Sequence, residues 1–197
     1  YILGNWTIVT GLSYSLFGLN NSQSIEPRFS LKYYINNKNS INIGYGLHSR
    51  LHSLATYYFG KYYPGIGYYE TNKKLKFSKA HHVVIGYSYN INKNLYYKIE
   101  SYYQYLFNIP VEKKSSWYSL INSGTSWGPD TRDNLINKGY GKNYGIEFTF
   151  EKFLSNNFYF LTTISLYNSK YKGSDNIWHN TTFNGNYIIN ILGGYEY

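Results

Sequence analysis

The stretch that most constrains the fold is "HHVVIGYSYNINKNLYYKIESYYQYL", residues 81–106, where tyrosine and aliphatic residues occupy nearly every second position. A period of two is typical of a β-strand, whose successive side chains point to opposite faces of a sheet. Strands of globular proteins usually have about six residues, and here the alternation lasts roughly twice that long on each side of "NKN". The two faces of this hairpin therefore contact two different media over a long distance.

Eight segments of the chain show the same alternation. In each, aromatic or aliphatic residues form one face and polar or small residues form the other. In "KNYGIEFTFEKF", for example, Ile146 and Phe148 alternate with Glu147 and Thr149. The segments are 6–16, 27–35, 40–49, 81–91, 95–107, 142–153, 158–170 and 186–192. We predict an all-β protein built from eight long strands.

The connections between these segments alternate in length. Short ones, rich in the Asn that tolerates left-handed backbone, lie at 36–39, 92–94 and 155–157. Long ones lie at 17–26, 50–79, 109–141 and 171–185. Only an up-and-down antiparallel order puts every second connection at the same end of a sheet. Short turns at one end and long loops at the other are typical of an outer-membrane β-barrel.

The alternative is a soluble β-sandwich, whose strands also alternate. Its strands would be shorter, and it would have no reason to sort its connections into two length classes. The sequence contains no run of about 18 apolar residues, so we predict no transmembrane helix. Membrane strands stay compatible with the sequence because half of their residues can be polar. Tyrosines near the segment ends fit an aromatic belt at the membrane surface.

The composition limits the kinds of partner and of binding site that the chain can have. The chain has 197 residues and a net charge of +9, which suits an anionic partner. The joint excess of Lys, Asn, Ile, Tyr and Phe also fits the bias of an AT-rich genome. The absence of cysteine excludes disulfides and thiolate metal sites. Because the chain begins at Tyr1 and contains no Met, we expect a mature or internal fragment whose targeting signal lies elsewhere.

Two histidines are the first candidates for ligand binding. His48 ends one predicted strand and His82 begins the next, so both are expected at the loop end, on the inner face of neighbouring strands. Converging imidazoles can bind a metal or a ferric chelate. They can equally hydrogen-bond to wall or loop groups, and we predict no resident metal or cofactor.

The loops and the inner face supply the other candidates. Residues 57–77 mix aromatics with lysines, which suits stacking on sugars or chelates and equally suits contact with anionic lipid headgroups. In 122–139, the cluster of Asp130, Arg132 and Asp133 could also form a self-contained ion pair. Further ligand candidates are Tyr62, Tyr63, Trp127 and Arg132. The charges expected to face the lumen, where they line a path or pair across strands, are Arg28, Lys32, Lys98, Glu100, Glu147 and Glu151.

Catalysis and nucleic-acid binding find little support. Ser78 lies near His81 and His82 in the sequence, but no G-x-S-x-G elbow or evident acidic partner accompanies them. A lipid-modifying enzyme is therefore only a distant alternative, and we predict no enzyme. The basic residues are scattered among the strands without a nucleic-acid-binding motif, so we expect no nucleic-acid partner.

Four stretches together resemble one family: "EPRFSLKYYINNKNSINIGYGLHSR", "KAHHVVIGYSYNINKNLYYKIESYYQYLFNIPVE", "NKGYGKNYGIEFTFEKFLSNNFYFLTTISLYNSKYKGSD" and "NTTFNGNYIINILGGYEY". With these stretches in this order, the chain resembles the TonB-dependent outer-membrane receptors of Bacteroidetes that carry a carboxypeptidase-regulatory-like domain. The resemblance covers nearly the whole chain, and no single short motif decides it.

The resemblance implies a transmembrane barrel of 22 strands, of which residues 1–197 form about eight, without the plug domain and the remaining strands. It also implies import of a bound siderophore, cobalamin, oligosaccharide or similar ligand, with energy from a TonB–ExbB–ExbD complex. Outer-membrane lipid would surround the wall. The alternative is a small closed barrel of eight strands that serves as a surface anchor or adhesin. We expect the fragment to fold stably only with its missing strands, because open sheet edges are not viable in lipid.

Overall fold

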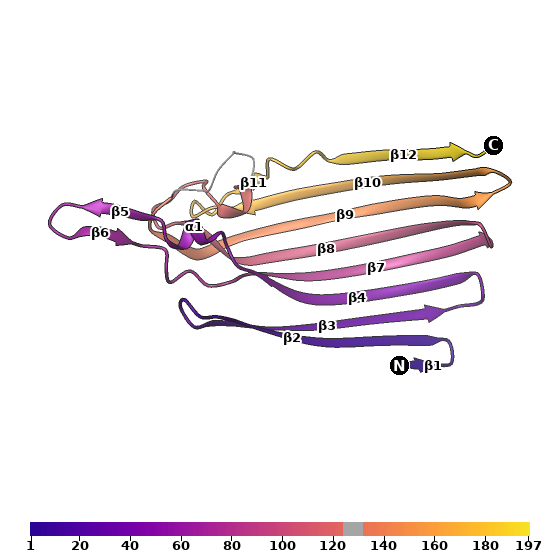
Figure 1. Ribbon diagram of the computed structural model, residues 1–197, viewed down its shortest axis with the longest axis horizontal. Helices are drawn as coiled ribbons and strands as arrows, with labels where there is room; N and C mark the ends of the chain where they lie inside the picture. Colours follow the sequence, from indigo (N-terminus) through magenta and orange to yellow (C-terminus); the bar gives the residue numbers. More distant parts are fainter. Residues whose placement is uncertain (124–131) are drawn as a thin grey trace.

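The structure is a computed structural model that describes residues 1–123 and 132–197, and its main feature is one long antiparallel sheet (Figure 1). Eight long strands form this sheet in the order in which they occur in the sequence. They are β2 (Trp6–Phe17), β3 (Ser22–Tyr34), β4 (Asn39–Arg50), β7 (Ser78–Asn92), β8 (Leu95–Glu112), β9 (Leu135–Ser155), β10 (Phe158–Lys172) and β12 (Tyr187–Tyr195). The predicted up-and-down sheet is confirmed.

Several short elements accompany the long strands. At the turn end β1 (Ile2–Leu3) pairs with β2, and at the loop end β11 (Trp178–Asn180) pairs with β10. Helix α1 (Leu54–Tyr57), the hairpin of β5 (Gly60–Tyr63) and β6 (Gly67–Glu70), and the 3-10 helix η1 (Leu120–Asn122) lie within the loops. No helix in the described part of the chain is long and apolar enough to cross a membrane.

The strands extend further toward the loops than the sequence pattern predicted. The prediction of a long connection over 17–26 is wrong, because β3 begins at Ser22 and only residues 18–21 connect it to β2. The alternation continues through these added residues: Ser24 and Glu26 are buried, whereas Ile25 between them is exposed. The other long connections are also shortened, as β8 ends at Glu112 and β9 begins at Leu135.

The outer face of the sheet is apolar and uncovered. One row of directly paired residues crosses it through Trp6, Tyr33, Ile41, Tyr87, Ile99, Phe148, Ile164 and Ile189. Ile85 and Ile146, in the neighbouring row, are each 53% exposed. No second layer of described residues packs on this face. A soluble sandwich would bury such a surface, so the outer face is built to contact lipid.

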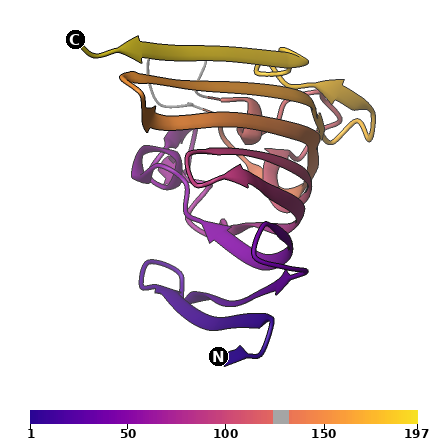
Figure 2. The ribbon, with the colours of Figure 1, turned by 90° about the vertical axis from the view of Figure 1, so that its right-hand side faces the viewer.

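The inner face is polar and contains small residues. The matching row crosses it through Lys32, Asn42, Gly86, Glu100, Glu147 and Ser165. Several of its side chains are less exposed than the apolar ones opposite, since the sheet is bowed (Figure 2). The distribution is the reverse of that in a water-soluble protein, with apolar residues outside and polar residues inside.

Asparagine makes the chain reversals. Every non-glycine residue with positive φ in the described ranges is an Asn, and Asn side chains also accept hydrogen bonds from the backbone in the turns after β3 and β7. The residues with positive φ are Asn21, Asn108, Asn134, Asn156, Asn157, Asn176 and Asn186. Asn tolerates the left-handed region better than most residues with a side chain, and it does so in the predicted turn at 155–157. The predicted turns at 36–39 and 92–94 use Asn through its side-chain acceptor instead.

The sheet stays open. Strands β2 and β12 lie at its opposite edges, and no ladder between described residues joins them (Figure 2). A small barrel closed by these eight strands would require that ladder. The open edges therefore favour a wall that is part of a larger ring over the alternative of a closed eight-stranded anchor.

Candidate ligand-binding surface at the loop end

A buried apolar cluster holds the loops on the end of the sheet. Tyr57, Leu75, Tyr118 and Leu135 form its centre, and each is at most 7% exposed. Phe17, Leu19 and Leu51 pack against it. These residues come from the ends of β2, β4 and β9 and from the segments between strands. The loops therefore form a packed cap with its own small core.

Asn72 ties three segments of this cap together. Its side chain is fully buried and donates hydrogen bonds to the carbonyl oxygens of Thr56 (3.0 Å) and Arg132 (2.8 Å). Its Oδ1 accepts from the backbone N–H of Leu135 at 3.0 Å. No pattern in the sequence indicates this role, because Asn in the polar stretch "ETNKK" has the appearance of a solvated loop residue.

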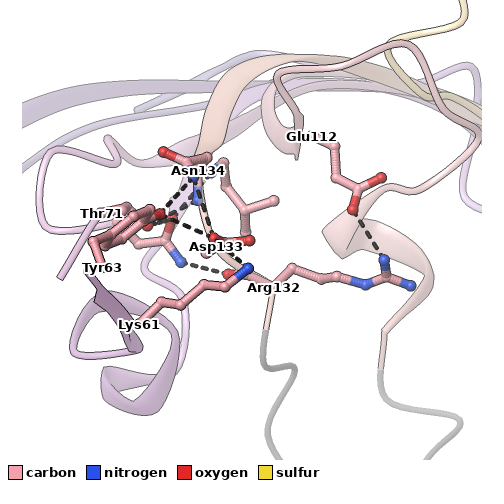
Figure 3. A network of polar contacts seen from close by, with 9 residues as sticks. Lys61, Tyr63, Thr71, Glu112, Arg132, Asp133 and Asn134 are labelled. Carbon is pink, nitrogen blue, oxygen red and sulfur yellow. Dashed lines mark hydrogen bonds and ion pairs between the residues drawn. The ribbon is translucent and has the colours of Figure 1, made fainter. Parts of the chain in front are cut away.

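A polar network joins the β5–β6 hairpin to the start of β9 (Figure 3). The Tyr63 hydroxyl donates to Asp133 Oδ2 at 3.1 Å, and Lys61 Nζ lies 3.7 Å from the same oxygen. Beside it, Arg132 donates to Glu112 Oε1 at 2.9 Å and lies over the Tyr118 ring. The polar ends of the predicted ligand residues Tyr63 and Arg132 thus already contact Asp133 and Glu112, on opposite sides of this network.

Of the suggested self-contained ion pair among Asp130, Arg132 and Asp133, the two described members, Arg132 and Asp133, do not pair with each other. Arg132 pairs with Glu112 at the end of β8, and Asp133 pairs with Lys61 in β5. Asp130 and Trp127 lie outside the described residues. Tyr62 is 69% exposed on the β5–β6 hairpin, so its ring is open to contact from outside.

A cavity of about 470 Å³ lies on the inner face, beneath this cap. Strands β4, β7 and β8 form its wall, and α1 and η1 contribute to its lining. It is partly apolar, with Leu106, Ile109 and Ile121 in its wall. Its polar lining includes Arg50 and Gln104, and no carboxylate of the described residues lines it. The cavity is suited to an organic ligand that carries negative charge or hydrogen-bond acceptors.

His48 and His82 take the positions that the strand pattern predicted. Both lie on the inner face of paired strands, with ring centroids 6.2 Å apart, and His48 lines the cavity. No group of three or more His, Cys, Asp or Glu residues in the described ranges could hold a metal ion. The pair therefore offers hydrogen bonds to a ligand, and its role as a binding site stays a prediction.

The pairing of Ser78 with His81 or His82 is not found. His81 lies on the outer face, where its Nδ1 is 2.9 Å from the Tyr45 hydroxyl. Ser78 instead lies 3.3 Å from Nε2 of His52. Burial lowers the pKa of His52 to about 4, so its ring is neutral at pH 7 and contributes hydrogen bonding without charge.

The predicted lumen charges lie on the inner face, but their contacts are mostly local. Arg28 pairs with Glu26 at 3.2 Å, and Lys98 pairs with Glu100 at 2.6 Å, in each case two residues away on the same strand. The expectation that these charges pair across strands is therefore wrong for both, because side chains two residues apart on a strand share one face.

The remaining lumen charges are less fully paired. Lys32 lies over the ring of Tyr34, and Glu151 accepts a hydrogen bond from Tyr96 on the adjacent strand at 2.7 Å. Glu147 is directly opposite Glu100, and no described cation lies within ion-pair distance of it. The inner face therefore keeps an acidic spot that faces the lumen.

Comparison with known proteins extends this description. No family model and no curated protein matches the sequence. Among solved structures, the outer membrane transporter YddB from Escherichia coli matches over 96% of this chain, with a TM-score of 0.64 and 15% identity. The ferric enterobactin receptor PfeA of Pseudomonas aeruginosa matches over 86%, with a TM-score of 0.60 and 14% identity.

The FrpB iron transporter of Neisseria meningitidis matches over 90% of this chain, with a TM-score of 0.58 and 14% identity. The fold is that of an outer-membrane barrel wall. The matched regions are 26%, 29% and 28% of the FrpB, YddB and PfeA chains, so this chain spans little more than a quarter of each. Together with the apolar outer face, this fold places the wall in the bacterial outer membrane.

Proposed function

We propose that this chain is part of the barrel of a TonB-dependent outer-membrane receptor that imports a bound ligand. The observation that carries the proposal is the reversed sheet, with an uncovered apolar outer face and a polar inner face. Such a wall separates lipid from a wet or protein-filled lumen. The folds of YddB, FrpB and PfeA, which are described as transporters or a receptor, support binding and transport rather than catalysis.

The open edges support a larger ring. An unpaired strand edge in lipid leaves backbone groups without hydrogen bonds, at a cost of several kcal/mol each. We propose that further strands complete a barrel of 22, as the family resemblance implies. In that barrel, a plug domain of the same protein would contact the six charged side chains of the inner face. These are Arg28, Lys32, Lys98, Glu100, Glu147 and Glu151. A TonB–ExbB–ExbD complex would supply the energy for import.

The ligand would bind at the loop end, in the cavity beneath the cap. Its apolar wall and its Arg50, His48 and Gln104 groups suit a ferric siderophore, a cobalamin or an oligosaccharide. The exposed ring of Tyr62 would add a contact from the loop end, and Trp127 is proposed as a further ligand residue from its residue type alone. We propose no bound metal or cofactor of the protein's own.

The test uses the full-length protein in the outer membrane of a host that lacks its own receptors. Uptake of radiolabelled ferric siderophores, cyanocobalamin and oligosaccharides is measured with and without a protonophore. We expect one probe to be bound in both conditions and imported only without the protonophore. Uptake that the protonophore does not change would indicate passive diffusion and contradict a TonB-dependent receptor.

A matched pair of variants locates the site. His48→Ala removes an inner-face ring that lines the cavity, whereas His81→Ala removes a ring on the outer face of the adjacent strand. We expect weaker binding of the imported probe only in His48→Ala. Equal loss of binding in both variants would show that the cavity is not the binding site.

A further inference from the structure

Three lysines gather on the outer face, at the loop end of β9 and β10. Lys142 and Lys170 are directly opposite each other across the two strands, and Lys172 follows two residues later on the same face. Like charges in directly opposite positions destabilise a sheet. This arrangement is therefore unfavourable unless an anion lies between or above the ammonium groups.

Trp178 on β11 organises the group. It is directly opposite Lys172 in the ladder between β10 and β11. Its ring lies 4.4 Å from Lys142 Nζ and 5.2 Å from Lys172 Nζ, so a single indole contacts two ammonium groups. Cation–π contacts hold both lysines near the strand ends without neutralising their charge.

No carboxylate of the described residues balances these lysines. None of the ion pairs between described residues includes Lys142, Lys170 or Lys172. A lysine at the opposite end of the same face behaves differently. The Lys152 ammonium donates to the carbonyl oxygens of Ser155 and Phe158, so its hydrogen-bond partners lie within the β9–β10 turn.

The position of the three lysines along β9 and β10 indicates which part of the membrane surrounds them. Tyr144 is two residues and Ile146 four residues nearer the middle of β9, on the same face. At about 3.4 Å per residue, the cluster begins roughly 7 Å beyond the Tyr144 ring and 14 Å beyond Ile146. Tyrosine marks the level where hydrocarbon meets headgroups. The lysines therefore lie at headgroup height, next to the lipid-facing band.

We propose that Lys142, Lys170 and Lys172, positioned by Trp178, bind the phosphate group of a phosphorylated glycolipid in the outer leaflet. The inference rests on the proposed function, with the long loops extracellular and the short turns periplasmic as in outer-membrane barrels generally. Lysine ammonium groups bind phosphate as point charges, and the neighbouring apolar face accommodates the acyl chains of the same molecule. This site is separate from the inner-face cavity, so it concerns the membrane around the receptor rather than its cargo.

Lysines near a membrane surface each strengthen the attraction to anionic lipid by about fivefold. Replacement of all three by Gln is therefore expected to weaken binding of the glycolipid on the order of 100-fold. The control variant K38Q/K74Q/K93Q removes the same total charge from exposed positions in the β3–β4 turn, the β6–β7 loop and the β7–β8 turn, away from the outer-face cluster. It is expected to bind the glycolipid as the unmodified protein does.

The experiment uses the full-length receptor in a mild detergent, with lipid A as the probe and native mass spectrometry to count bound molecules. Dephosphorylated lipid A separates phosphate recognition from acyl-chain contact, and added inorganic phosphate tests whether free phosphate competes. We expect lipid A to remain bound to the receptor and to the control variant. It should be lost from K142Q/K170Q/K172Q, and dephosphorylated lipid A should bind weakly to all three proteins.

Heat modifiability on a gel confirms that each variant is folded, and K142R/K170R/K172R, which keeps the charge, should restore binding. Equal retention of lipid A by the Gln and control variants would overturn the proposal, as would equal retention of dephosphorylated lipid A. If the Gln variant is not folded, the single variant K170Q is measured, with a fivefold loss expected and no loss refuting the site. Loss of lipid A with normal ligand uptake separates this site from the proposed import function.

Discussion

Asn72 offers the sharpest test of how the loop cap is held together. In Asn72→Ala, the carbonyl groups of Thr56 and Arg132 lose their donor, and the N–H of Leu135 loses its acceptor. Each such hydrogen bond contributes a net free energy of about 1 kcal/mol, and a buried group left without a partner costs about 1–3 kcal/mol. The cap should therefore lose at least about 3 kcal/mol of stability against local opening.

Hydrogen exchange measures this change directly, because the amide of Leu135 is protected by Asn72 Oδ1. A loss of about 3 kcal/mol corresponds to exchange on the order of 100-fold faster, given 1.36 kcal/mol per tenfold. The assay is exchange with mass spectrometry on the full-length protein, following peptides that contain Thr56 and Leu135. Asn37→Ala, at an exposed turn position, is the control and should leave these peptides unchanged.

Exchange at Leu135 that stays within about threefold of the unmodified protein would contradict a holding role for Asn72 in the cap. An equal acceleration in the peptides of the mid-sheet strands would also refute it. That outcome would mean that Asn72 supports the whole barrel rather than the cap. A confined acceleration would establish that the cap opens as a unit separate from the wall.

Three further outcomes are expected. Because burial lowers the pKa of His52 to about 4 from an ordinary 6.5, the opened cap binds protons more readily, so cap stability should be complete above pH 6.5 and fall as the pH drops toward 4. His52→Asn should remove this pH dependence of hydrogen exchange, and an unchanged profile would contradict it. Ile85→Lys should cost about 2–4 kcal/mol and reduce membrane insertion, whereas Ser88→Lys on the inner face should insert normally; equal insertion would show that the faces are misassigned. Glu147→Gln should raise the free energy of unfolding by about 0.5 kcal/mol, seen as a slightly higher urea midpoint, because it removes repulsion with Glu100. A lowered midpoint would indicate a cation partner.

The wall of this protein could be predicted from sequence because lipid imposes a local rule. Ile85, Ile99 and Phe148 must each alternate with polar neighbours, since one face meets hydrocarbon and the other does not. The rule acts on adjacent residues, so it can be read without knowing the partner strands. It failed at Ser22–Glu26, where the strand continues through residues that resemble a polar loop.

The cap could not be predicted in the same way, because its contacts join distant positions. Asn72 binds backbone groups that are 16, 60 and 63 residues away, and nothing near it in the sequence indicates that it is buried. The β5–β6 hairpin did leave a local signal. "YYPGIGYY" places Pro and Gly between paired tyrosines, and Gly65 and Gly67 have the positive φ that such a turn requires.

The asparagines with positive φ limit how this wall can evolve. Most other side chains at these positions would cost about 1–2 kcal/mol, whereas glycine would relieve the strain. These positions can therefore drift between two residue types, and codons for Asn are rich in A whereas those for Gly are rich in G. A lineage whose genome changes its base composition could exchange one for the other at these seven positions and keep the same wall.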